Sequence, residues 1–328
     1  MSGALLRDGL LLIDKEAGGT SHDVVQRVRR ILGEKRVGHC GTLDPDATGL
    51  LLVTVGIATR LTRFLISAPK VYEGTIRFGV ATDTYDAAGR VTAEAPAAGL
   101  THDAVAAAMA GFVGEIDHAS PAYSAKKHQG RKLYELARRG EEVPVETKRV
   151  TVYEFTPVGE ISSSPGAGLR PDSPGAGLRP DDARIDFRLA CSSGTYARTL
   201  AHEVGRAVGT GAHLARLRRL RIGTFYVENS VSLDALAAAV EAGEAPGSAW
   251  IPFDDVPLPF AEVTADAQQE RRVLHGQTVL VRDLGGEEGD WVRLVDRRHK
   301  TLAVGTFAER IGERGVGIVQ PRIVFGGR

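Results

Sequence analysis

Residues 38–55 read GHCGTLDPDATGLLLVTV, a polar, glycine-rich segment that runs directly into an apolar one. The apolar part, residues 50–55, predicts a buried strand. The part before it predicts a tightly turned loop, because glycine lets the backbone turn sharply and approach a ligand closely. Asp44 precedes Pro45, which favours an extended backbone and would hold the carboxylate in a defined place. This loop is therefore the first candidate for a functional site.

The patterns around this loop mix strands and helices. Upstream, residues 9–13 predict a buried strand, and residues 21–32 predict an amphipathic helix that Ser21 caps and Gly33 ends. Further expected elements are strands over residues 71–80 (half-exposed) and 183–191, and helices over residues 103–112, 133–139 and 195–208. The order does not alternate strictly as βαβ. The sequence therefore predicts an α+β fold on a large mixed, mostly antiparallel sheet with flanking helices.

A perfect repeat interrupts the larger part of the chain. SPGAGLRPD at residues 164–172 recurs word for word at residues 173–181. The segment is dense in Pro, Gly and Ser and has no apolar periodicity. We therefore expect a flexible loop insertion over residues 162–182.

The C-terminal part has the pattern of a separate small β unit. A Pro-rich stretch at residues 251–260 is followed by short strand candidates between glycine-rich turns. These candidates are residues 278–282, 291–296, 302–307 and 317–325. Their spacing predicts a small β-barrel. We therefore expect two domains, a larger one over residues 1–250 and the barrel over residues 251–328.

Composition excludes several classes of protein. Among 328 residues, Lys+Arg and Asp+Glu are 41 each, so the chain does not bind polyanions by bulk charge, although a local basic face is possible. Cys40 and Cys191 are too few and too far apart for a disulfide framework or a Cys-rich zinc site. No apolar run approaches the roughly 20 residues of a membrane span, and the run at residues 10–13 meets Asp14 and Lys15 at once. We expect a cytoplasmic protein with no membrane partner.

One motif suggests phosphatase chemistry. Asp44, Asp46 and Thr48 fit D-x-D-x-T, in which the first aspartate attacks phosphorus, the second acts as acid and base, and magnesium is bound. That motif should close a buried strand, because such sites form at the carboxyl edge of a sheet. Residues 35–42 are too polar for such a strand. A magnesium-dependent aspartyl phosphatase is therefore not the preferred interpretation and stands only as an alternative.

Basic residues gather in three short stretches despite the zero net charge. They are Arg27, Arg29, Arg30, Lys35 and Arg36; Lys126, Lys127, Arg131, Lys132, Arg138 and Arg139; and Arg216, Arg218, Arg219 and Arg221. A single run is usually a solvated face. Local basic runs of this kind are candidate contacts for phosphate groups. A non-catalytic RNA-binding protein is the other alternative.

Ordered blocks along the chain resemble the bacterial tRNA pseudouridine synthase B family. Residues 38–51 are similar to its catalytic motif. Further blocks follow in the family's order at residues 14–21 (DKEAGGTS), 70–72 (KVY), 82–89 (TDTYDAAG), 121–126 (PAYSAK) with 133–138, 191–200 (CSSGTYARTL) and 213–225. The likeness covers residues 9–235 apart from the repeat, and residues 274–277 and 320–321 match more loosely the PUA-like RNA-binding barrel that ends this family. Glu16 departs from the pattern, where the family usually has proline.

The resemblance implies a pseudouridine synthase fold that isomerises uridine 55 in the T-loop of tRNA. The N-glycosidic bond breaks, the uracil turns, and its C5 joins C1′ of the sugar. Glycosidases use two carboxylates, one of which handles water. Here water must be excluded, so a single carboxylate in a dry pocket is expected, and that residue is Asp44. The target base must be flipped out of its stack, which costs a few kcal/mol.

The resemblance also assigns roles around Asp44. Tyr72 is expected to stack on the flipped base and to accept the C5 proton, and Arg198 is expected to pair with Asp44. His39 is expected to help take the place of the flipped base. The expected substrate-binding residues are Lys15, His39, Tyr196, Arg218, Arg219 and Leu220. The expected partner is the T-arm of tRNA; the chain is expected to act as a monomer without a metal, a cofactor or a protein partner.

Overall fold

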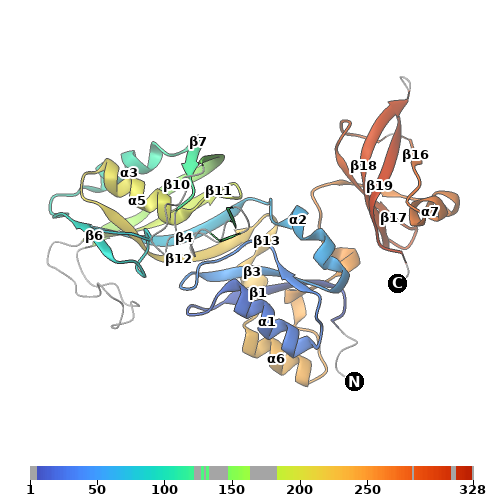
Figure 1. Ribbon diagram of the computed structural model, residues 1–328, viewed down its shortest axis with the longest axis horizontal. Coiled ribbons are helices and arrows are strands. Elements are labelled where there is room, and N and C mark those ends of the chain that lie inside the picture. The colour runs from blue at the N-terminus through green and yellow to red at the C-terminus, as the bar shows by residue number, and fades with distance from the viewer. Residues whose placement is uncertain are drawn as a thin grey trace.

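The computed structural model describes residues 6–121, 127–128, 131–132, 147–162, 183–282, 284–311 and 315–326. The expected helix at residues 133–139 and the repeat at residues 164–181 lie outside the described residues. A long sheet flanked by helices forms most of the molecule, and the C-terminal unit lies at one end of it (Figure 1). No helix in the described part of the chain is long and apolar enough to cross a membrane.

The body is a ten-stranded sheet. From edge to edge its main strands are β14 (Trp250–Pro252), β1 (Gly9–Lys15), β3 (Thr48–Val55), β12 (Ala212–Ile222), β4 (Lys70–Phe78), β11 (Ala183–Cys191), β10 (Thr147–Ser162) and β7 (Gly114–Ala119), with β2 (Val37–His39) on β3 and β13 (Phe225–Tyr226) on β12. All of these pairs are antiparallel except β12 with β3. The predicted α+β class with a large mixed, mostly antiparallel sheet is confirmed.

Helices cover the two halves of this sheet. The main ones are α1 (Ser21–Leu32), α3 (His102–Ala110), α5 (Ala197–Ala207) and α6 (Leu233–Glu241). Helices α1 and α6 pack side by side under β1 and β3, whereas α3 and α5 lie over the half that contains β10 and β4 (Figure 1). Smaller elements are α2 (Thr62–Leu65), β5 (Val80–Thr82), β6 (Val91–Glu94), β8 (Lys127–His128), β9 (Arg131–Lys132) and 3-10 turns at Gly56–Leu61, Val227–Asn229, Gly247–Ala249 and Phe253–Asp255.

Strands β1 and β3 are uniformly apolar because both of their faces are buried. Leu11 and Ile13 pack towards α1 and α6. Leu10 and Leu12, on the opposite face, share a cluster with Phe64 and with residues of the C-terminal unit. This double burial holds β3 firmly, and the glycine-rich loop of residues 40–47 leads into it.

The N-terminal cap of α1 differs from the prediction by one residue. Thr20 is the cap: its side chain accepts from Asp23 N–H, and the Asp23 carboxylate accepts from Thr20 N–H. Ser21 is buried instead, and its Oγ accepts from Leu43 N–H at 2.8 Å and donates to Leu43 O at 3.1 Å. Gly33 ends the helix in the left-handed conformation at φ 64°, as predicted. Helix α1 therefore anchors the loop that contains Asp44.

Strand β4 is not half-exposed as predicted. It ends at Phe78, before Val80, and it lies in the centre of the sheet between β12 and β11. Arg77 is only 5% exposed and lies between its register partners His213 and Arg184, which are also buried. Alternation of polar and apolar residues alone does not reveal polar neighbours that cover a strand from both sides.

The C-terminal unit is a curled, five-stranded half-barrel. Its order is β15 (Ala261–Thr264), β17 (Trp291–Val295), β18 (Thr301–Ile311), β19 (Val316–Val324) and β16 (Val279–Val281), with α7 (Ala267–Leu274) beside it. The four predicted strands are present, while β15 and α7 were not predicted. Phe64 of the body meets Phe260 and Trp291 edge-on at 4.8 Å between ring centroids. The unit is therefore packed on the body through a shared aromatic cluster.

Candidate active site

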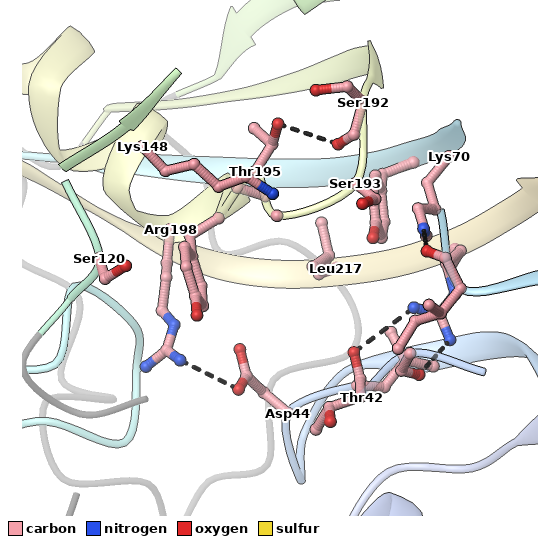
Figure 2. A pocket seen from close by; sticks show the side chains of 18 residues that line it. Thr42, Asp44, Lys70, Ser120, Lys148, Ser192, Ser193, Thr195, Arg198 and Leu217 are labelled. Atoms are coloured by element: carbon pink, nitrogen blue, oxygen red, sulfur yellow. Dashed lines mark hydrogen bonds and ion pairs between the residues drawn. The ribbon is translucent and has the colours of Figure 1, made fainter. Parts of the chain in front are cut away.

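A pocket of about 470 Å³ opens over the middle of the sheet (Figure 2). Its walls come from the loop before β3, from β4 and β12, and from the segment that begins α5. The lining residues are Gly41, Thr42, Leu43, Asp44, Ile66, Lys70, Tyr72, Ser120, Lys148, Ser192, Ser193, Gly194, Thr195, Tyr196, Ala197, Arg198, Leu217 and Arg219. The structure thus brings Asp44, Tyr72 and Arg198 together from segments far apart in the sequence.

Asp44 and Arg198 form an ion pair inside this pocket. Arg198 Nη2 donates to Asp44 Oδ1 at 3.1 Å (Figure 2). The Arg198 side chain is 6% exposed, whereas that of Asp44 is 40% exposed, so the carboxylate faces the pocket with the guanidinium behind it. Burial raises the pKa of Asp44, and the positive charge of Arg198 opposes that rise. Arg198 therefore favours the ionised carboxylate where its surroundings favour the protonated one.

A second carboxylate, Asp86, holds Arg198 from the other side. Its Oδ2 lies 3.6 Å from Arg198 Nη1, which also points at the Thr84 carbonyl oxygen at 3.5 Å. Thr84 Oγ1 donates to Asp86 Oδ1 at 2.5 Å, and Thr82 Oγ1 donates to Asp86 O at 2.7 Å. Residues 82–89 are one of the blocks that resemble the family, but no role was predicted for Asp86. Thr82 and Thr84, which precede it in the sequence and hydrogen-bond to it, were the signal from which its place could have been predicted.

Tyr72 forms the inner wall of the pocket. It is 8% exposed and lies between its register partners Leu189 on β11 and Arg219 on β12. Burial raises the pKa of Tyr72, while the Arg219 charge opposes the rise. The phenol is therefore neutral in the resting site.

Lys15, expected to bind substrate, lies beneath the loop of residues 40–47 instead of in the pocket. It is 1% exposed. Its Nζ donates to Ala47 O at 2.7 Å, Pro45 O at 2.8 Å and Glu16 O at 2.9 Å. These three bonds use all of the ammonium protons. Burial lowers the pKa of Lys15 to about 8. The contacts make Lys15 a residue that positions the loop, and the exposed Glu16 side chain leaves this anchor in place.

Replacing this anchor should destabilise the protein measurably. Lys15→Met keeps the length of the side chain but leaves the Pro45 and Ala47 carbonyls without their donor. An unsatisfied buried polar group costs about 1–3 kcal/mol, so we expect the free energy of unfolding to fall by about that amount. Urea denaturation measures it, and Lys35→Met, at an exposed position, is the matched control. An unchanged free energy of unfolding in Lys15→Met would contradict the anchoring role.

Arg219, also expected to bind substrate, is buried at 1% exposure although it borders the pocket. Nε donates to Leu50 O at 2.7 Å, Nη2 to Gly41 O at 3.1 Å and Nη1 to Thr42 O at 3.4 Å. Its backbone pairs with Gly49, whose φ of 97° suits only glycine and where a Cβ would meet the Arg219 backbone. Arg219 thus ties β12, β3 and the loop together.

Two expected binding residues on β12 face away from the pocket. Because neighbouring residues of a strand point to opposite faces, Leu217 and Arg219 line the pocket, whereas Arg218 and Leu220 do not. Leu220 packs in the apolar cluster around Phe64. Arg218 forms two hydrogen bonds with the Asp14 carboxylate, at 2.8 and 2.9 Å. The leucine of the pocket is therefore Leu217, which corrects the expectation for Leu220.

Tyr196 lines the pocket at the start of α5, and His39 does not line it. The Tyr196 N–H donates to His118 Nε2 at 2.9 Å, and its ring lies 5.9 Å from the Arg198 guanidinium carbon. Burial lowers the pKa of His118 to about 4, so this ring is a neutral acceptor. Sequence reasoning missed His118. His39 is half-buried on β2, and burial lowers its pKa.

Two lysines, Lys70 and Lys148, line the pocket (Figure 2). Lys70 Nζ donates to Ile66 O and Ala68 O at 2.6 Å each, and burial lowers its pKa to about 8. Lys148 lines the pocket from an exposed position on β10. Of the three predicted basic stretches, the middle one lies mostly outside the described residues. Arg27 pairs with Asp234, so part of the first stretch already has an acidic partner.

Comparisons with known proteins agree on one family. Residues 29–197 match the model of the TruB family pseudouridylate synthase N-terminal domain, and residues 198–255 match that of the tRNA pseudouridylate synthase B C-terminal domain. The tRNA pseudouridine synthase B of Thermobifida fusca is 41% identical over 98% of this chain and 100% of its own length. That of Ralstonia pickettii is 39% identical over 91% of this chain and 87% of its own.

Solved structures share the fold. A Cbf5-Nop10-Gar1 complex contains a chain with a TM-score of 0.69 and 25% identity, covering 96% of this chain and 84% of that one. An H/ACA RNP bound to a substrate RNA containing 2'-deoxyuridine contains one with a TM-score of 0.70 and 24% identity, covering 98% and 86%.

Proposed function

The chain belongs to the TruB family of pseudouridylate synthases, which isomerise uridine in tRNA, and we propose that its target is uridine 55 of the T-loop and its catalytic carboxylate Asp44. The observation that supports Asp44 is its ion pair with Arg198 inside the pocket. The pair aims a carboxylate at a space lined by Tyr72. The pocket is thus suited to one flipped base.

The number of acidic side chains in the pocket suits isomerisation. Among the described residues that line it, Asp44 is the one carboxylate. Glycoside hydrolysis uses two carboxylates flanking the bond, one of which activates water or its equivalent. Asp86 stands behind Arg198 and Asp46 lies exposed on the loop, so neither is placed as that second group. This arrangement also disfavours the phosphatase alternative, which needs Asp46 as acid and base.

Tyr72 is proposed as the stacking platform and as the acceptor of the C5 proton. Its phenol is neutral in the resting site. It can therefore accept the C5 proton only if it gives up its own O–H proton at the same time. The ring is held by its strand neighbours, so it can stack on the uracil without ordering cost. Tyr196, which also lines the pocket, is proposed to pack against the base from the α5 side.

The tRNA partner is proposed to bind over the basic rim. Lys148 is exposed at the pocket edge, and Arg216 is exposed on β12. We further propose that residues 1–250 form the catalytic domain, that residues 251–328 form a PUA-like RNA-binding unit, and that the chain acts as a monomer without a protein partner. The aromatic contacts of Phe64 hold the two parts together.

A pair of tRNA transcripts tests the position of the target. Purified chain alone should release tritium from a transcript labelled at C5 of its uridines. A matched transcript with cytidine at position 55 should release none. Equal release from both transcripts would refute position 55 while leaving the isomerase activity in place.

Removing the Arg198 charge should shift the pH dependence of turnover. The charged groups facing Asp44 are Arg198, Asp86, Lys15 and Asp46. Without Arg198 the pKa of Asp44 rises further, so the ionised form, and with it activity, is lost at a higher pH as the solution is acidified. For Arg198→Met we expect the acid limb of kcat to move up by about one pH unit or more, and Arg198→Lys to move it less. An unmoved limb would contradict the pairing.

A further inference from the structure

Tyr85 adopts a left-handed backbone conformation that residues other than glycine rarely adopt. It lies in the turn between β5 and β6 with φ 64°. Its N–H donates to Thr82 O at 3.3 Å, and its carbonyl accepts from Leu214 N–H at 2.9 Å. A strained conformation of this kind persists only where the surroundings hold it. The turn therefore needs more support than the same turn with a glycine.

The ring of Tyr85 supplies such support through a stacking contact. It stacks on the imidazole of His202, with ring centroids 4.0 Å apart and planes 16° apart. Burial lowers the pKa of His202, so the imidazole is neutral near pH 7 and presents a flat, uncharged face. His202 lies four residues after Arg198 on α5. Residues four apart lie on the same face of a helix, so both side chains project towards the turn.

Helix α5 thus touches this turn at two adjacent places. Arg198 reaches the Thr84 carbonyl oxygen at 3.5 Å and the Asp86 carboxylate at 3.6 Å, which lie on either side of Tyr85 in the chain. His202 holds Tyr85 itself. A shift of the turn relative to α5 would move both partners of the guanidinium together.

We propose that the Tyr85–His202 stack is a positioning pair for the reaction. It holds the strained turn against α5 and so sets where Thr84 and Asp86 meet Arg198, the residue that aims Asp44. Neither ring lines the pocket, so the pair acts through Arg198 and does not touch the substrate. The inference rests on the proposed role of Asp44.

Strain at Tyr85 makes the proposal testable by a double-mutant cycle. His202→Ala removes the support while the strain remains, so the turn should relax. We expect the single-turnover rate of pseudouridine formation to fall about three- to tenfold, the range of an aromatic pair, with tRNA affinity unchanged. Glycine adopts the left-handed conformation freely. In a Tyr85→Gly background, His202→Ala should therefore cost less than about twofold, which is below the range of an aromatic pair.

Conservative variants and a matched control separate positioning from general destabilisation. Tyr85→Phe and His202→Phe keep two stacked rings and should restore a rate close to that of wild type. His299 is the other non-glycine residue with positive φ in the described chain, at 59°, and it lies in the C-terminal unit. With tRNA at saturation, His299→Gly should leave the single-turnover rate unchanged, because a change of affinity in the C-terminal unit does not alter the rate at saturation. Thermal melting of each variant shows that it is folded.

Two results would overturn the proposal. One is a wild-type rate for His202→Ala. The other is an equal fold-loss from His202→Ala in both backgrounds, since additive effects mean that the rings are not coupled. If His202→Ala does not fold, the same comparison is made with His202→Leu. An active Asp44→Asn variant would refute the proposed function instead, because the cycle measures product formation whichever group performs the chemistry.

Discussion

Asp44→Asn should abolish pseudouridine formation and leave tRNA affinity within about tenfold of wild type. The amide keeps the volume of the side chain and its place beside Arg198, but it loses the charge and can neither attack carbon nor take a proton. Such a group contributes roughly 10²–10⁴ or more in rate. Single-turnover product formation and filter binding, measured on one tRNA transcript, separate the chemical loss from a binding loss.

Asp46→Ala is the matched control for this loss. Asp46 is exposed and lies two residues away on the same loop. We expect it to keep pseudouridine formation within about tenfold of wild type, because no step of the isomerisation is assigned to Asp46, whereas an acid–base group would contribute about 10²–10⁴ in rate. Activity of Asp44→Asn above about 1% of wild type would remove Asp44 from the chemistry. A larger loss of activity in Asp46→Ala than in Asp44→Asn would favour the phosphatase alternative, which uses both Asp44 and Asp46.

Tyr72→Phe should stall turnover while tRNA binds as tightly as to wild type. Phenylalanine keeps the ring that stacks on the flipped uracil but removes the hydroxyl that accepts the C5 proton. The expected loss is roughly 10²–10⁴ in rate. Tyr72→Leu should be as inactive and should bind more weakly, by up to the 1–3 kcal/mol of about one base stack. Tritium release from C5-labelled tRNA, with affinity measured in parallel, distinguishes the two roles.

The opposite pattern would assign Tyr72 a smaller part. Near-normal tritium release by Tyr72→Phe, with the loss confined to Tyr72→Leu, would mean that the ring is only a platform. Asp44, or a water that it holds, would then take the proton. The raised pKa of Tyr72 gives this comparison its weight, because a neutral phenol accepts a proton only in a relay.

Apolar runs predicted the elements that hold the site. Strands β1 and β3 were recognisable as apolar runs because both of their faces are covered, and β11 was recognisable because its apolar residues alternate along one face. Helix α1 was recognisable from its apolar face and its final Gly33, with an error of one residue at the cap. The error arose because Thr20 and Ser21 are both good caps, and only the contact between Ser21 and Leu43 distinguishes them.

The direction of the basic side chains was not predictable in the same way. Lys15 and Arg219 are of the basic residue types that bind RNA. Both are nevertheless buried and donate to backbone carbonyls of the loop. Their acceptors lie about 30 and 178 residues away in the chain, so no local pattern marks them. Leu217 and Leu220 have equal hydrophobicity, and only the pairing of β12 decides which of them lines the pocket.

Mapping of pseudouridine in an unmodified tRNA transcript, after incubation with the purified chain alone in EDTA, tests both the target position and the role of Asp44. We expect pseudouridine at position 55 and at no other uridine, formed by wild type and Asp46→Ala and not by Asp44→Asn. Product at another position, or product at position 55 from Asp44→Asn, would contradict it.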